Sequence, residues 1–192
     1  MHTLCPLCHS ATVMPSSEGA GESCAEHYAA LIRRERSDLR YMRSHALTVD
    51  TWAAQHPESD EADSHQALGV HLVSLYAQLV LGMSHREVKG IRQRATETID
   101  FRRLPLPGEP ATVSAAHPLA ADHPDAHRRL VQQWARSVWQ AWDPHHAQIM
   151  SWARRVIGHG RVAVPPEQVH SGWYAGARNI VHPTADTPVS SE

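Results

Sequence analysis

The chain contains three cysteines and sixteen histidines among its 192 residues, and both residue types bind metal ions. The three cysteines precede a histidine in the spacing Cys5-x2-Cys8-x15-Cys24-x2-His27. Two residues between ligands allow a pair of side chains to bind the same cation, and three thiolates with one imidazole form a common tetrahedral zinc site. We therefore predict a structural zinc ion at these four residues. Such an ion would attach the N-terminal segment to the first helix and stabilise the fold.

Other interpretations of the cysteines stay open. His2 or His9 could replace His27 as the fourth ligand. The Cys-x2-Cys pair could instead be a redox-active dithiol, although Pro6 between the two cysteines and the lack of a helix directly after them argue against it. Three unrelated thiols are the simplest alternative. Zinc is preferred because a Cys-x2-Cys pair near a terminus is seldom incidental in a reduced protein.

A second group of polar residues falls on faces that the apolar pattern predicts to be buried. His71 shares a face with Leu68, Leu72 and Leu75, and Glu35 lies on the apolar stripe of the first helix. A buried imidazole without a partner costs about 1–3 kcal/mol, and a glutamate is almost never buried unpaired. Each residue should therefore bind a metal ion or a hydrogen-bonding partner. The candidate ligands of a second, inner metal site are His45, Asp50, His56, His71, His145 and His146.

Three imidazoles, or two with a carboxylate, would leave an open coordination position for water or substrate. The predicted ion at this inner site is zinc, iron or manganese, with Glu35 or Asp50 as the catalytic general base. This interpretation makes the protein a metal-dependent enzyme that performs hydrolysis or group transfer on a small-molecule substrate. The alternative is a non-catalytic, zinc-stabilised interaction or regulatory module, whose buried histidines form a hydrogen-bonded network that orders the core.

Apolar residues at helical spacing predict an all-α fold in which four to five helices pack as a bundle. The sequence Ser84-His-Arg-Glu87 is a capping box that opens one helix, and Asp143-Pro144 restarts or kinks the last one. The predicted helices cover residues 24–43, 50–56, 60–81, 84–99 and 124–158. The predicted organisation is a metal-binding knuckle over residues 1–27, a helical bundle over 24–158 with an irregular connection at 100–123, and an irregular tail over 159–192. Histidines outside the apolar stripes, predicted to be exposed, include His117, His123 and His127.

Composition restricts the partners and the compartment. The formal net charge is −2 and Lys89 is the single lysine, so no basic surface for nucleic acid is predicted. The longest apolar stretch, at residues 68–81, is too short to span a bilayer, and the first residues lack the pattern of a secretion signal. An odd number of cysteines argues against a disulfide framework. We expect a soluble, reduced, cytoplasmic protein, and the sequence gives no prediction of its oligomeric state.

Two resemblances add to this interpretation. The string Leu47-Thr-Val-Asp-Thr-Trp-Ala-Ala-Gln-His-Pro57 resembles an uncharacterised bacterial family of unknown function. The N-terminal Cys-x2-Cys, His71-Leu72 and the tryptophan-rich segment from Trp134 to His145-His146 extend that resemblance over residues 5–155. It implies no activity.

The second resemblance is weaker. His71 on one helix and His145-His146 on a late one are similar to the DNA-damage-inducible, thiol-transferase-like four-helix metalloenzymes, which carry a late His-x3-His pair. This chain has Ala141 and Trp142 at the positions four residues earlier. The resemblance therefore implies a three-histidine site here only if His45 or His56 supplies the missing ligand.

Overall fold

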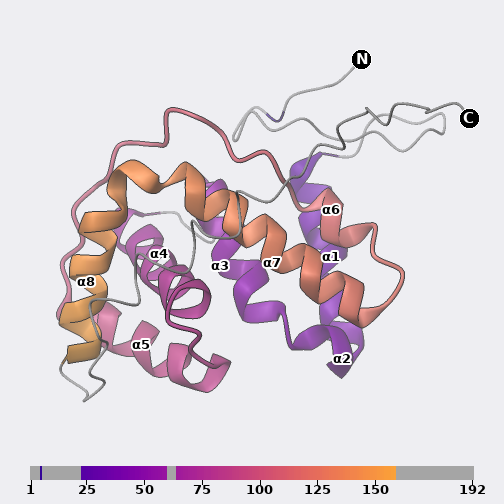
Figure 1. The fold of residues 1–192 in the computed structure, drawn as a ribbon, viewed down its shortest axis with the longest axis horizontal. Helices are drawn as coiled ribbons and strands as arrows, with labels where there is room; N and C mark the ends of the chain where they lie inside the picture. Colours follow the sequence, from indigo (N-terminus) through magenta and orange to yellow (C-terminus); the bar gives the residue numbers. More distant parts are fainter. Residues whose placement is uncertain (1–4, 6–22, 60–63, 159–192) are drawn as a thin grey trace, which may run out of the picture. The chain divides into compact units, whose positions relative to one another are not determined.

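The computed structural model describes residues 5, 23–59 and 64–158, and all regular elements in these ranges are helices. In chain order they are α1 (Cys24–Ser37), α2 (Leu39–Met42), α3 (His45–Gln55), α4 (His65–Leu79), α5 (His85–Thr98), α6 (Ala116–Leu119), α7 (Pro124–Ala141), the 3-10 turn η2 (Asp143–His145) and α8 (His146–Gly158) (Figure 1). The predicted all-α bundle is confirmed for these residues. Most of the predicted knuckle and all of the predicted tail lie outside the described residues.

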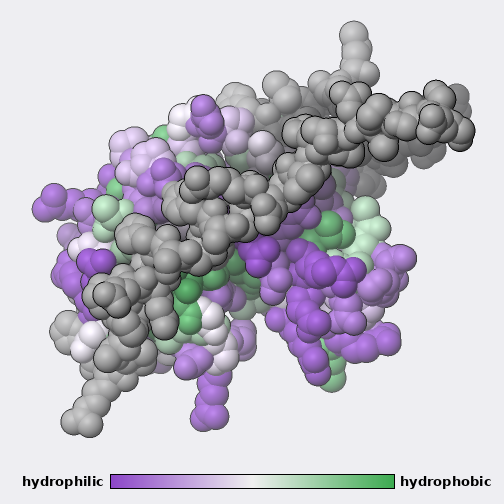
Figure 2. Space-filling model, in the orientation of Figure 1, coloured by the Kyte–Doolittle hydropathy of each residue, from purple (hydrophilic) through white to green (hydrophobic). Residues whose placement is uncertain are grey.

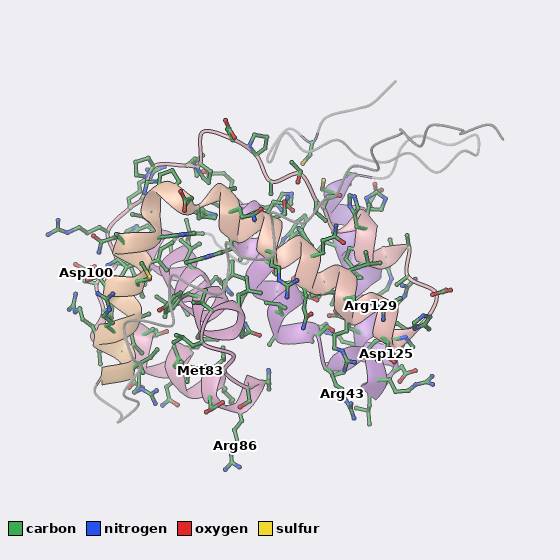
Figure 3. All side chains as sticks on the ribbon, viewed as in Figure 1. Arg43, Met83, Arg86, Asp100, Asp125 and Arg129 are labelled. Atoms are coloured by element: carbon green, nitrogen blue, oxygen red, sulfur yellow. The ribbon has the colours of Figure 1, made fainter. Side chains whose placement is uncertain are left out.

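Two helices lie at the centre of the packing. Helix α3 contacts α1, α4 and α7, and α4 contacts α3, α5, α7 and α8. Their shared core contains large side chains without solvent exposure, among them Leu72 and Leu75 of α4, Trp134 of α7 and Ile149 of α8. Hydrophilic residues cover most of the described surface on the face shown in Figure 2. The side chain of Arg86 projects from α5 at the lower edge of the view in Figure 3, and Arg43 and Arg129 are exposed as well.

The prediction of one continuous helix over residues 24–43 is wrong. Helix α1 ends at Ser37 because Asp38 adopts an extended conformation (φ −146°, ψ 123°). The Asp38 carboxylate then caps α2 by accepting a hydrogen bond of 2.8 Å from the backbone N–H of Arg40. Because aspartate competes for local backbone N–H groups, it favours helix starts over helix interiors. The break turns the chain toward α3.

The short helix predicted over residues 50–56 is longer than expected and begins at His45. Thr48 therefore lies inside α3, and its hydroxyl donates a hydrogen bond to Glu35. The connection at 100–123 also contains the short helix α6. The earlier start of α3 places His45, Thr48 and Asp50 on one helix.

The late part of the chain matches its apolar pattern. Val131, Trp134 and Val138 of α7 are buried, as are Ile149 and Trp152 of α8. The predicted interruption at Asp143-Pro144 is confirmed, because the turn η2 separates the two helices. None of the helices in the described ranges combines the length and apolar character that crossing a membrane requires.

Candidate metal centre

Three potential metal ligands meet where Cys5 lies beside the start of α1 and the end of α3. The ligand atoms of Cys5, Cys24 and His56 all lie within 4.8 Å of one another, and Cys5 Sγ is 3.8 Å from His56 Nε2. The three residues are 5%, 4% and 0% exposed. In the described part of the chain, this is the one group of three or more histidine, cysteine or acidic side chains close enough to hold an ion.

Cys24 is positioned by the start of α1, where it is the first helical residue. A capping box fixes this start. Ser23 Oγ accepts a hydrogen bond of 3.3 Å from Glu26 N–H, and Glu26 Oε2 accepts one of 2.5 Å from Ser23 N–H. These hydrogen bonds lower the pKa of Glu26 below its usual value.

His56 is positioned by the end of α3. Pro57 follows it and disfavours a helical conformation at His56, which accordingly has φ −126° and ψ 70°. The imidazole stacks on Trp52 with ring centroids 3.6 Å apart, and Trp52 stacks on Tyr28 of α1 at 4.3 Å. His56 Nδ1 lies 3.4 Å from the carbonyl oxygen of Trp52. Metal-binding histidines have this arrangement, in which one nitrogen contacts a carbonyl oxygen and the other faces the ion.

Helix α7 holds the end of α3 in place. Trp142 Nε1 donates a hydrogen bond of 2.9 Å to the carbonyl of Ala54. Trp134 Nε1 donates one of 2.8 Å to Gln55 Oε1, and Gln55 Nε2 donates one of 2.8 Å to the carbonyl of Val113. Because these bonds fix the two residues before His56, the imidazole is held by the core and not by a loose loop.

The remaining residues of the predicted cysteine site have different positions. His27 is buried in α1, but it is not among the three residues whose ligand atoms meet. Cys8, His2 and His9 lie outside the described residues. The sequence assigned His56 to the inner site, whereas the structure places it beside Cys5 and Cys24.

Glu35 is the centre of a separate polar cluster and is fully buried. Its carboxylate accepts hydrogen bonds from His45 Nδ1 at 3.0 Å, from Thr48 Oγ1 at 2.6 Å and from His127 Nε2 at 2.9 Å. His127 is itself fully buried, so the prediction that it is exposed is wrong. Its spacing of four residues to Val131 and seven to Trp134 is a signal for the buried stripe of α7.

Asp50 is the centre of a second, similar cluster and is also fully buried. His71 Nδ1 donates a hydrogen bond of 2.7 Å to Asp50 Oδ1, and Gln78 Nε2 donates one of 2.6 Å to Oδ2. Arg92 Nη2 donates to Oδ1 and forms a salt bridge. Sequence reasoning identified Asp50 and His71 but not Gln78 and Arg92, because nothing local links them to α3.

The last two candidates, His145 and His146, lie at the junction of η2 and α8. His146 stacks on Trp139 with centroids 3.8 Å apart, and its Nε2 donates a hydrogen bond of 2.9 Å to the carbonyl of Trp139. Burial lowers the pKa of His146 below its usual value. The ring of His145 packs against the ring of Trp142 with centroids 5.6 Å apart. The six residues proposed for one inner site thus belong to four different surroundings.

The fold and the site define an all-helical protein with a buried pair of cysteines and a histidine that could bind a metal ion. The chain belongs to a family of unknown function (DUF5946), whose model matches residues 3–143. This bears out the resemblance to an uncharacterised family, and the matched range includes all three residues of the cluster. Comparison with curated proteins gave no match, and comparison with solved structures gave none either.

Proposed function

We propose that this protein is a zinc-stabilised helical module in which Cys5, Cys24 and His56 hold a structural zinc ion, with Cys8 as the fourth ligand. The observation that carries the proposal is the convergence of three buried ligand atoms within 4.8 Å from three separate segments of the chain. Thiolate and imidazole are the ligands that structural zinc sites use most.

The fourth ligand follows from the chelating pair in the sequence. Cys8 is separated from Cys5 by two residues, a spacing that lets both thiolates bind the same cation. The resulting Cys3His set contains the three cysteines predicted from the sequence and exchanges His27 for His56. The ion would link residues that are 51 positions apart, so its binding free energy would contribute to folding.

The surroundings of the other candidate ligands support a structural role over a catalytic one. Glu35 and Asp50, the candidate general bases, are fully buried and each accepts three or more hydrogen bonds. A carboxylate held in this way positions its partners and does not reach a substrate. A pocket of about 220 Å³ is lined in part by Gln55, Pro57 and Trp142, but none of the candidate inner ligands lines it.

The proposal is tested by the metal content of the purified full-length protein, measured by inductively coupled plasma mass spectrometry. We expect about one zinc ion per chain, which is lost in Cys24→Ser, His56→Ala and Cys8→Ser. The matched control is His27→Ala, because His27 is also buried on α1 and should not change the zinc content. Circular dichroism at low temperature checks that each variant remains helical.

Three outcomes would contradict the proposal. Zinc that survives Cys24→Ser would remove the site altogether. Zinc that is lost in His27→Ala and retained in His56→Ala would restore the ligand set predicted from the sequence. About two metal ions per chain, one of which is lost in His71→Ala, would favour the metal-dependent enzyme.

A further inference from the structure

The Asp50 cluster is open to solvent through three half-buried members, His71, Gln78 and Arg92. Asp50 itself has no exposed side-chain surface, whereas the side chain of His71 is 15% exposed and that of Arg92 is 29% exposed. The buried carboxylate is therefore an anchor, and another molecule can reach both the imidazole and the guanidinium.

Hydrogen bonds fix the orientation of both exposed groups. His71 uses Nδ1 to bond Asp50, so Nε2 is the ring nitrogen that remains available. Arg92 donates from Nε to Ser74 Oγ at 3.3 Å, and from Nη2 to Asp50 and to the carbonyl of Ala46 at 3.4 Å. These bonds account for two of the three guanidinium nitrogens and leave Nη1. Each side chain thus keeps one polar group that its bonds to the bundle do not use.

The two groups also lie close together. His71 Nδ1 and Arg92 Nη2 both donate to the same oxygen, Asp50 Oδ1. Two hydrogen bonds to one acceptor place the donor atoms no more than about 6 Å apart. An imidazole and a guanidinium at this separation can contact different oxygens of one small anion.

The donors of the cluster suit an anion. Arg92 carries a positive charge and its side chain is 29% exposed, and the imidazole of His71 lies beside it on the same carboxylate oxygen. The planar guanidinium is well suited to phosphate and carboxylate groups, with which it forms directional hydrogen bonds.

We propose that His71 and Arg92 form a binding site for a small oxyanion at the junction of α3, α4 and α5, with Asp50 as the positioning residue. The ligand class is a small molecule that carries a phosphate or a carboxylate group. This site is separate from the proposed zinc site, and it gives the Asp50 cluster a binding role without a second metal ion.

The Glu35 cluster is an internal control for this proposal. Glu35 also bonds a partly exposed histidine, His45, whose side chain is 24% exposed. The other donors to Glu35 are Thr48 and the buried His127, so its cluster supplies a carboxylate and an imidazole without a guanidinium. A response that needs the arginine should therefore occur at His71 and not at His45.

The experiment follows the imidazole signals of both histidines by proton–nitrogen NMR of the full-length protein as purified. Inorganic phosphate and acetate are titrated in separate arms at constant ionic strength, with sodium chloride as the balancing salt. We expect the His71 ring signals to shift saturably with one or both anions while those of His45 stay unchanged. A response to phosphate alone assigns a phosphate ligand, and a response to acetate alone assigns a carboxylate.

Variants of α5 show whether Arg92 is required. In Arg92→Gln the apparent affinity for the anion should fall about tenfold or more, while the exposed control Arg86→Gln should bind as the native protein does. Arg92→Lys keeps the charge but loses the planar donor group, so it should weaken binding even if Arg92→Gln does not fold. Equal shifts of His71 and His45, no saturation, or unchanged affinity in the folded Arg92→Lys variant would overturn the proposal.

Discussion

Glu35 and Asp50 show how single buried acids can organise an α-helical core. Each carboxylate is fully buried and satisfies its hydrogen-bonding capacity with side chains from other helices. A buried charge is stable only when it is paired or hydrogen-bonded in this way. Both acids therefore fix the relative positions of the helices that supply their partners.

For Glu35, replacement by glutamine should be strongly destabilising. The amide keeps the shape of the side chain, but its NH2 group faces hydrogen-bond donors where the carboxylate had an acceptor oxygen. We expect Glu35→Gln to lower the free energy of unfolding by about 2–4 kcal/mol, measured by urea denaturation. The control Glu97→Gln, at an exposed position of α5, should change it by less than about 0.5 kcal/mol. Equal denaturation midpoints for the two variants would contradict this.

His146 should make stability fall at mildly acidic pH. Burial lowers its pKa in the folded state below the ordinary value of 6.5, so the unfolded chain takes up a proton more readily. Its contribution is therefore fully present above pH 6.5 and is lost as the pH falls through and below that value. We expect His146→Gln to lose less stability than the native protein between about pH 7.5 and 5.5. The exposed His85→Gln is the control, and an identical pH dependence for native protein and His146→Gln would refute the assignment.

Among the elements, α4 depends on a close approach that only glycine permits. Phe101 is buried after the end of α5, and its ring meets Trp152 edge to face at 5.0 Å. A Cβ atom added to Gly69 would lie 2.3 Å from Phe101 Cγ. Gly69 therefore lets the chain after α5 pack directly on the backbone of α4.

The prediction for this contact is that Gly69→Ala lowers the free energy of unfolding by about 1–3 kcal/mol through overpacking, although alanine is the better helix former. Gly90→Ala on α5 is the matched control, since its Cβ would meet the flexible end of Arg94 at 3.3 Å. That variant should stabilise the protein by about 0.5–1 kcal/mol. Thermal and urea unfolding of both variants measure the difference, and stabilisation by both substitutions would show that Phe101 moves aside at little cost.

The helices show which parts of the fold local sequence can predict. The capping box at Ser84 and Glu87 marks the start of α5, and the stripe from Val131 to Val138 marks the buried face of α7, because both signals lie within a few residues. The break at Asp38 was missed because Leu39 and Met42 continue the apolar helical spacing of Leu31 and Ile32 across it.

The candidate site was less predictable because its contacts join residues that are far apart in the sequence. The cysteine spacing pointed to metal binding, but the contact of His56 with Cys5 joins residues 51 positions apart. No local pattern encodes that distance, since it depends on how α1 and α3 pack through Tyr28 and Trp52. The partners of Asp50 in α4 and α5 were hidden in the same way.

For the molecule as a whole, the proposed zinc ion would join the start of the chain to α1 and to the end of α3. The core of α4, α7 and α8 is built from residues such as Leu72, Trp134 and Ile149, which are fully buried without any metal ligand among them. Removal of zinc should therefore lower the stability of the protein without abolishing its helical structure at low temperature.

We expect a strong zinc chelator to lower the Tm by about 8–16 °C while the far-ultraviolet circular dichroism at 20 °C stays largely helical. A metal present at a thousand times its Kd contributes about 4 kcal/mol, and a chain of this length changes its Tm by about 2–4 °C per kcal/mol. Cys24→Ser should begin at the lower Tm and show no response to the chelator or to added zinc. A native protein whose Tm is unchanged by chelation would show that the three ligands at this junction are held together by packing alone.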